Sequence, residues 1–217
     1  MELVGPHEVR HAGELAVVTL EPLAESADWT VPAGALAWTC RRTLDHLCDC
    51  LLYYSGQLAR RTDRQGPLLR DGDAEASITT LVTTVGSAAA VLAAVAEGTP
   101  PDARAYHPAG MADRSGYCAM GVDELLVHTD DIAAGLGVPF DPPAEICAVV
   151  VARLFRGRRP ATIRGRPCAG PTAESRWATT GRSTRTGTGT ARRSPSGTAT
   201  AHAGARHPAG REARYSS

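Results

Sequence analysis

Two short patterns in the sequence bring together residue types that bind metal ions. Glu124 and His128 lie four residues apart in Glu-Leu-Leu-Val-His. On a helix this spacing separates two side chains by about 40° around the axis, so both point to the same side, one turn apart. His46 lies far upstream between Leu44 and Leu47. If the two segments are helices that pack through their apolar faces, His46 meets Glu124 and His128 at the margin of the core.

Two imidazoles and one carboxylate suit a divalent transition metal, with zinc first and nickel, iron or manganese as alternatives. Three protein ligands leave one coordination position for water or substrate, as a catalytic site requires. Each pattern also has a plainer interpretation. A Glu-xxx-His pair is common on helix surfaces, and a single histidine such as His46 is commonly a partly buried core residue.

Three further residues lie close to these patterns. Cys50 follows His46 by one helical turn and is an outside candidate for a ligand, although the ordinary role of such a cysteine is that of a small buried apolar residue. Asp131 and Asp130 could orient His128 from behind, or could be solvated acids. The six cysteines contain no CxxC pair, which excludes a zinc ribbon and a thioredoxin-like motif.

The segments that carry these residues have helical periodicity, with apolar residues recurring every three or four positions. The second helix has an apolar, core-facing stripe through Leu44, Leu47, Leu51, Tyr54 and Leu58. Asp141 is expected to cap a final helix with Pro142 at its first position. The predicted helices cover residues 8–25, 39–60, 74–97, 116–136 and about 142–155. The sequence thus predicts an all-α four-helix bundle with an extra C-terminal helix, and a loop over 29–38 held in place by its tryptophans.

Residues 156–217 differ sharply in composition from residues 1–155. Of these 62 residues, 54 are Arg, Gly, Ala, Ser, Thr or Pro, and 13 arginines face two acids. Residues 156–217 contain too few large apolar residues for their burial to offset the entropy lost when the chain is ordered. We therefore expect a disordered, basic, low-complexity tail after a folded domain 1–155. This tail is either a genuine Arg-rich arm or the product of a frameshift in GC-rich DNA.

The whole chain has 23 basic and 23 acidic residues and no net charge, although the first 155 residues carry −11 and the tail +11. Its uninterrupted apolar runs are shorter than the roughly 18 residues that span a bilayer, and its N-terminus lacks the order of a signal peptide. A cytoplasmic protein without a membrane partner is expected.

The segments Trp38-Thr-Cys-Arg-Arg-Thr-Leu-Asp-His46-Leu-Cys-Asp and Glu124-Leu-Leu-Val-His128-Thr-Asp-Asp131-Ile-Ala resemble those of a known superfamily. They are similar to DinB-like four-helix bundles, specifically the metal-binding N-terminal domain of mycothiol-dependent maleylpyruvate isomerases. The resemblance covers roughly residues 8–155.

This resemblance implies that His46, Glu124 and His128 bind a divalent metal, usually zinc. It also implies that the open position binds mycothiol, a low-molecular-weight thiol, because a zinc-bound thiol loses its proton at neutral pH and becomes a nucleophile. The reactive group is then a metal-activated thiol and not a side chain. The implied partners are that thiol and an electrophilic small molecule.

The sequence departs from the family after Phe155, where full isomerases continue into an α/β region. A general thiol S-transferase or isomerase-like activity is therefore the expectation. The alternative is a non-catalytic helical bundle with a structural or lost metal site, which binds nucleic acid through its Arg-rich tail.

Overall fold

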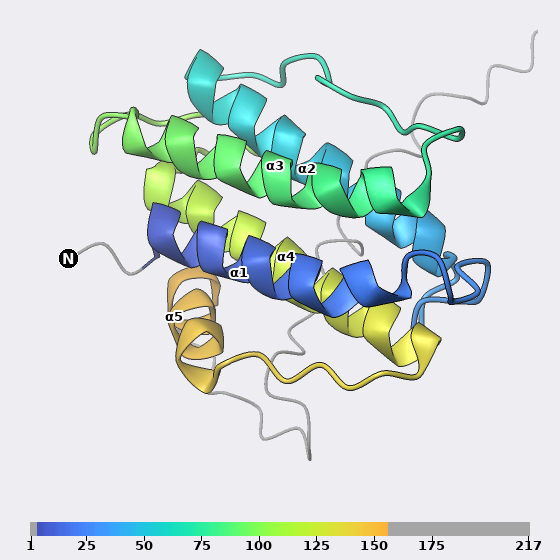
Figure 1. Cartoon of the computed structure of the whole chain (residues 1–217). Coiled ribbons are helices and arrows are strands. Elements are labelled where there is room, and N and C mark those ends of the chain that lie inside the picture. The colour runs from blue at the N-terminus through green and yellow to red at the C-terminus, as the bar shows by residue number, and fades with distance from the viewer. Residues whose placement is uncertain (1–3, 156–217) are drawn as a thin grey trace, which may run out of the picture.

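The computed structural model describes residues 4–155, and every regular element in this range is helical. Two isolated β-bridges occur, but the described range has no β-strand. The all-α prediction is confirmed for this part of the chain. The helices are α1 (Pro6–Leu20), the short 3₁₀ helix η1 (Glu21–Leu23), α2 (Cys40–Arg60), α3 (Ile78–Glu97), α4 (Arg114–Leu136) and α5 (Ala144–Leu154) (Figure 1).

The first four α-helices lie alongside one another, with α5 set steeply against them (Figure 1). α1 packs mainly against α3 and α4, and α2 packs mainly against α3 and α4. α5 packs against α4. Consequently α2 and α4, which carry the candidate ligands, are neighbours in space although α3 lies between them in the sequence.

Side-chain caps fix where α2, α3 and α4 begin. Thr39 Oγ1 accepts a hydrogen bond from the Arg42 backbone N–H at 3.2 Å, and Asp113 Oδ1 accepts one from the Gly116 N–H at 2.7 Å. Each bond satisfies one of the N–H groups that the first turn of a helix leaves without a partner. At its other end α4 stops at Gly137, which has a φ of 73°, a conformation that glycine adopts without strain.

The connection from η1 to α2 is an ordered loop that lies against the end of α4. Trp29 is buried, and its indole N–H donates to the Leu23 carbonyl at 3.1 Å. Gly135 of α4 makes the close approach possible, because a Cβ there would lie 2.7 Å from Cys40 Sγ and would also meet the backbone of the loop. The expectation of a loop held by its tryptophans agrees with this arrangement, which brings Trp38 to the candidate site.

Two of the predicted helix starts were wrong. α3 begins at Ile78 and not at residue 74, because Ser77 is its N-cap and accepts from the Thr80 N–H at 3.1 Å. α5 begins at Ala144, with Pro143 and not Asp141 as its N-cap. A residue that precedes proline is disfavoured in helical conformation, so the second of two consecutive prolines delays the helix.

The remaining boundaries differ by a few residues. α1 starts at Pro6 and ends at Leu20, after which η1 covers part of the predicted extension to residue 25. α4 starts at Arg114, two residues before its prediction. The predicted tail, residues 156–217, lies outside the described residues.

α3 is the one helix in residues 4–155 with the length and apolar composition of a membrane span. Its most apolar window has a mean hydropathy of 1.9, and 39% of that window is buried inside the protein. Core helices of soluble proteins meet the same criterion, which makes it weak support for a membrane span. Counting uninterrupted apolar runs missed this helix because threonines, a serine and a glycine interrupt its apolar residues.

Candidate metal centre

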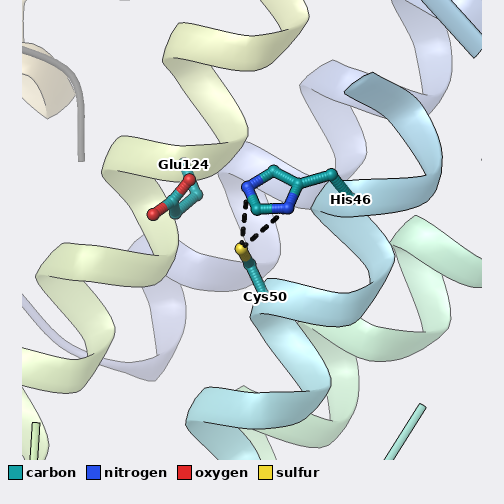
Figure 2. A group of neighbouring side chains, drawn as sticks. All are labelled: His46, Cys50 and Glu124. Carbon is teal, nitrogen blue, oxygen red and sulfur yellow. Dashed lines mark hydrogen bonds between the residues drawn. The ribbon is translucent and has the colours of Figure 1, made fainter. Parts of the chain in front are cut away.

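The candidate site lies between α2 and α4, with its donor side chains directed from each helix toward the other (Figure 2). His46 is in the second turn of α2, and Cys50 follows it by one turn. Glu124 and His128 are one turn apart on α4 and are only 4% and 1% exposed. The carboxylate and its histidine neighbour are therefore polar groups inside the core, where they require partners.

Glu124 is held through both of its carboxylate oxygens. Tyr54 of α2 donates its hydroxyl hydrogen to Oε1 at 2.9 Å, and His128 Nε2 lies 3.2 Å from Oε2. Tyr54 is fully buried, and its pKa is raised well above the ordinary value, first by burial and then by the charge of Glu124. It therefore remains a protonated donor across the physiological range.

His46, Cys50 and Glu124 form a group whose donor atoms all lie within 4.8 Å of one another. Cys50 Sγ is 3.2 Å from His46 Nε2 and 3.8 Å from Nδ1, and Figure 2 shows the imidazole lying beside both Cys50 and the Glu124 carboxylate. Nitrogen, sulfur and oxygen donors at such separations could all reach one ion after small side-chain adjustments. The donor set is one that zinc accepts.

His46 makes edge-to-face ring contacts with both His128 and Trp38. The ring centroids of His46 and His128 are 5.4 Å apart, and those of His46 and Trp38 are 5.0 Å apart. Arg42 lies over the Trp38 ring, with Cζ 4.2 Å from the ring centroid, in cation–π geometry. The stack restricts the His46 ring and covers it on the loop side.

Burial and neighbouring charges set the protonation states of the site. Burial lowers the pKa of His46, and the positive charges of His128 and Arg42 act in the same direction, while the Glu124 carboxylate opposes them. Burial by itself raises the pKa of Glu124, but His128, His46 and Tyr54 together bring it below the ordinary value. A neutral imidazole and an ionised carboxylate are the forms that bind metals.

A second acid lies next to the site on α4. Burial, together with the negative charge of Glu124, raises the pKa of Asp123 to about 7. On the far side of His128, Asp131 Oδ2 is 3.5 Å from Nδ1, the ring nitrogen opposite to the one that faces Glu124. This is an ion-pair distance, and the role of Asp131 in orienting the His128 ring, as an outer carboxylate does for a metal-binding histidine, stays a prediction.

The residues predicted as ligands, His46, Glu124 and His128, lie together in the structure, and their role as ligands stays a prediction. Sequence reasoning gave Cys50 a minor place and missed Tyr54 entirely. Both follow His46 at intervals of four residues, so they share its side of α2. Tyr54 was assigned to the apolar stripe because its ring is buried there, and only the contact with Glu124 shows a second role.

The arrangement fits a metal ion on the chemistry of its donors. Three residues of the donor types that zinc prefers converge within a few ångströms, and His128 lies against the same carboxylate. Comparison of the chain with known proteins gives no match to a family model, a curated protein or a solved structure.

Proposed function

We propose that this chain is a divalent-metal-binding protein of the DinB-like kind, in which α1–α4 form a four-helix bundle and His46, Glu124 and His128 bind the metal. The convergence of the donor atoms of His46, Cys50 and Glu124 between α2 and α4, within 4.8 Å of one another, carries the proposal of a metal site at this place. The contact of His128 with Glu124 adds the second imidazole. Zinc is the proposed ion, because imidazole nitrogens and a carboxylate oxygen are donors that suit it.

The proposed activity is transfer of a low-molecular-weight thiol, such as mycothiol, to an electrophilic small molecule in the cytoplasm, either as an S-transferase or as an isomerase-like enzyme. A bound metal would lower the pKa of a thiol that occupies its remaining coordination position. Glu124 is the only anion among the three proposed ligands, so a divalent ion there keeps positive charge with which to hold a thiolate.

The chain's own residues prepare the site. Tyr54 holds Glu124 Oε1, which leaves the second carboxylate oxygen, now facing His128, for an ion. Asp131 steadies His128 from the opposite ring nitrogen. Trp38 lies edge to face against His46, and Arg42 lies over the Trp38 ring. These contacts orient the ligands, and burial of Glu124 and His128 strengthens the attraction between an ion and these two ligands.

Elemental mass spectrometry of the purified full chain tests this proposal. We expect about one zinc per chain in the parent and its loss in His46→Ala and His128→Ala, with helicity by circular dichroism retained. His7→Ala is the matched control, because the His7 side chain is 86% exposed and lies on α1. Absence of metal from the parent, even after reconstitution with zinc, contradicts the proposal.

A second candidate function is non-catalytic, and the division of charge favours it. Residues 156–217 carry a net charge of +11 while the first 155 carry −11. A protein of this kind has a structural metal or none and binds nucleic acid through the basic segment. Its binding to duplex DNA should fall steeply with salt, by roughly 0.9 in log K per unit of log salt concentration for each phosphate contacted, and should vanish when residues 156–217 are removed.

A further inference from the structure

Cys50 has a position that the proposed three-ligand site does not use. It is 6% exposed, and its Sγ lies 3.2 Å from His46 Nε2 and within 4.8 Å of the nearest Glu124 donor oxygen. Cys48, two residues earlier on α2, faces elsewhere, with its Sγ 3.4 Å from the Leu81 carbonyl of α3. Cys40 Sγ lies near backbone carbonyls at 3.8 Å. Cys50 thus differs from both in lying among candidate metal donors.

We propose that Cys50 Sγ is itself a ligand of the metal in the resting protein, where it occupies the position that an external thiol takes during the reaction. This inference rests on the proposed metal site of His46, Glu124 and His128. It adds a residue to that site and a means of regulating access to it.

The geometry supports a shared ion. His46 and Cys50 are separated by one helical turn, so their donors lie on one side of α2 without any change in the backbone. Figure 2 shows Cys50 and Glu124 approaching the same imidazole from two helices. Thiolate sulfur is among the strongest zinc ligands, and four protein donors complete the tetrahedral coordination that zinc prefers.

A thiolate ligand changes the charge and the accessibility of the site. With Cys50 and Glu124 both anionic, a divalent ion is neutralised, and no position remains for an outside thiol. An external thiol enters only by exchange. The metal–Sγ bond of Cys50 breaks, the bond from the metal to the external sulfur forms, and the proton of the incoming thiol passes to Cys50. One thiolate replaces another, so total charge and oxidation states are unchanged.

Cobalt(II) substitution of the full chain tests this inference, because a thiolate bound to cobalt gives a near-ultraviolet charge-transfer band that nitrogen and oxygen ligands do not give. We expect the parent, without added thiol, to show this band and to saturate at one cobalt per chain. Cys50→Ser should lose the band and bind cobalt at least about 10- to 100-fold more weakly. That is the loss of metal affinity typical of removing a residue that only hydrogen-bonds to a ligand. Cys48→Ser is the control and should keep the band.

Addition of 2-mercaptoethanol distinguishes Cys50, the ligand in the resting protein, from an external thiol that takes its place. Cys50→Ser should regain a sulfur band on addition of this thiol, and should do so at lower thiol concentration than is needed to change the spectrum of the parent. An X-ray absorption spectrum of the zinc-loaded parent gives a second measurement that needs no variant. It should show a sulfur neighbour at about 2.3 Å beside nitrogen and oxygen neighbours at about 2.0–2.2 Å.

The outcomes distinguish this inference from the proposed function. Cobalt binding that depends on His46 and His128 but gives no sulfur band, or zinc without a sulfur neighbour, leaves the proposed metal site intact and overturns the role of Cys50. A sulfur band that survives in Cys50→Ser assigns the thiolate to another cysteine and also overturns it. Failure of the parent to bind any metal overturns both.

Discussion

Glu124 is a buried carboxylate whose two oxygens have different partners. A metal ion can bind the carboxylate oxygen that His128 now contacts, whereas Tyr54 contacts the other oxygen and need not move. Tyr54 is therefore expected to support both the fold and the site. It fixes the carboxylate rotamer and satisfies an oxygen that an ion bound at the other oxygen leaves without a partner.

Replacing Tyr54 by phenylalanine should affect stability and metal affinity together. The variant leaves a buried charged acceptor without its donor, which costs about 1.5–3 kcal/mol of unfolding free energy. Zinc affinity should fall about 10- to 100-fold. Urea unfolding and competition with a chromophoric chelator measure the two effects. Tyr117→Phe is the matched control, since its hydroxyl donates to the Tyr106 carbonyl. It should lose stability but keep zinc affinity, and an equal loss of affinity in the control contradicts the role of Tyr54.

At the scale of residues, the sequence predicts the donors on a single helix better than the contacts between helices. The spacing of Glu124 and His128 determines their common side of α4, and their contact at 3.2 Å agrees with it. Cys50 and Tyr54 depend on which face of α2 turns toward α4. Local periodicity does not decide between apolar packing and polar contact for a residue at the edge of a stripe, so their contacts could not be predicted.

Asp113 joins two helices at the beginning of α4. Its carboxylate caps α4 through Gly116 and accepts a bond from Arg153 of α5 at 2.6 Å. Burial by itself raises the pKa of Asp113, but the Gly116 N–H and the charge of Arg153 outweigh burial and hold the pKa below its ordinary value of 3.8. An acid with a lowered pKa stabilises the fold only while it is ionised.

Two variants of Asp113 should separate the cap from the ion pair. Asp113→Asn keeps a capping oxygen and loses the charge, at a cost of about 0–1 kcal/mol. Asp113→Ala loses the cap as well, at a cost of about 1 kcal/mol more. The charge-dependent deficit should be complete above pH 3.8 and should shrink as the pH falls through the lower, folded pKa. Urea unfolding at several pH values measures this, and a deficit that grows on acidification contradicts the assignment.

At the scale of elements, the sequence predicts which segments form helices better than it predicts the residue at which each helix begins. The apolar stripe and the glycine at its end identified α4 well, because Gly137 has the positive φ that such an end requires. The start of α5 was misjudged because the effect of Pro143 on Pro142 outweighs the capping preference of Asp141. The pairing of α2 with α4 depends on the order in which helices pack, which periodicity does not contain.

For the whole molecule, a metal held between α2 and α4 should stabilise the native state. A ligand that binds only the folded protein at a hundred times its Kd adds about 2.7 kcal/mol. For a protein of this size this raises Tm by about 5–10 °C. Calorimetry of the chelator-treated chain, with and without zinc, measures the shift. His46→Ala should show almost none, and an equal shift in that variant would place the binding site elsewhere.

Because α3 separates α2 from α4 in the sequence, the ribosome synthesises the two parts of the site at different times. His46 and Cys50 leave the ribosome 78 and 74 residues before Glu124, which at roughly 5–20 residues per second is a delay of about 4–16 seconds. During that interval the nascent chain carries an imidazole and a thiol one helical turn apart, without the carboxylate. Completion of the centre is therefore a late step of biogenesis, and it follows the emergence of α4.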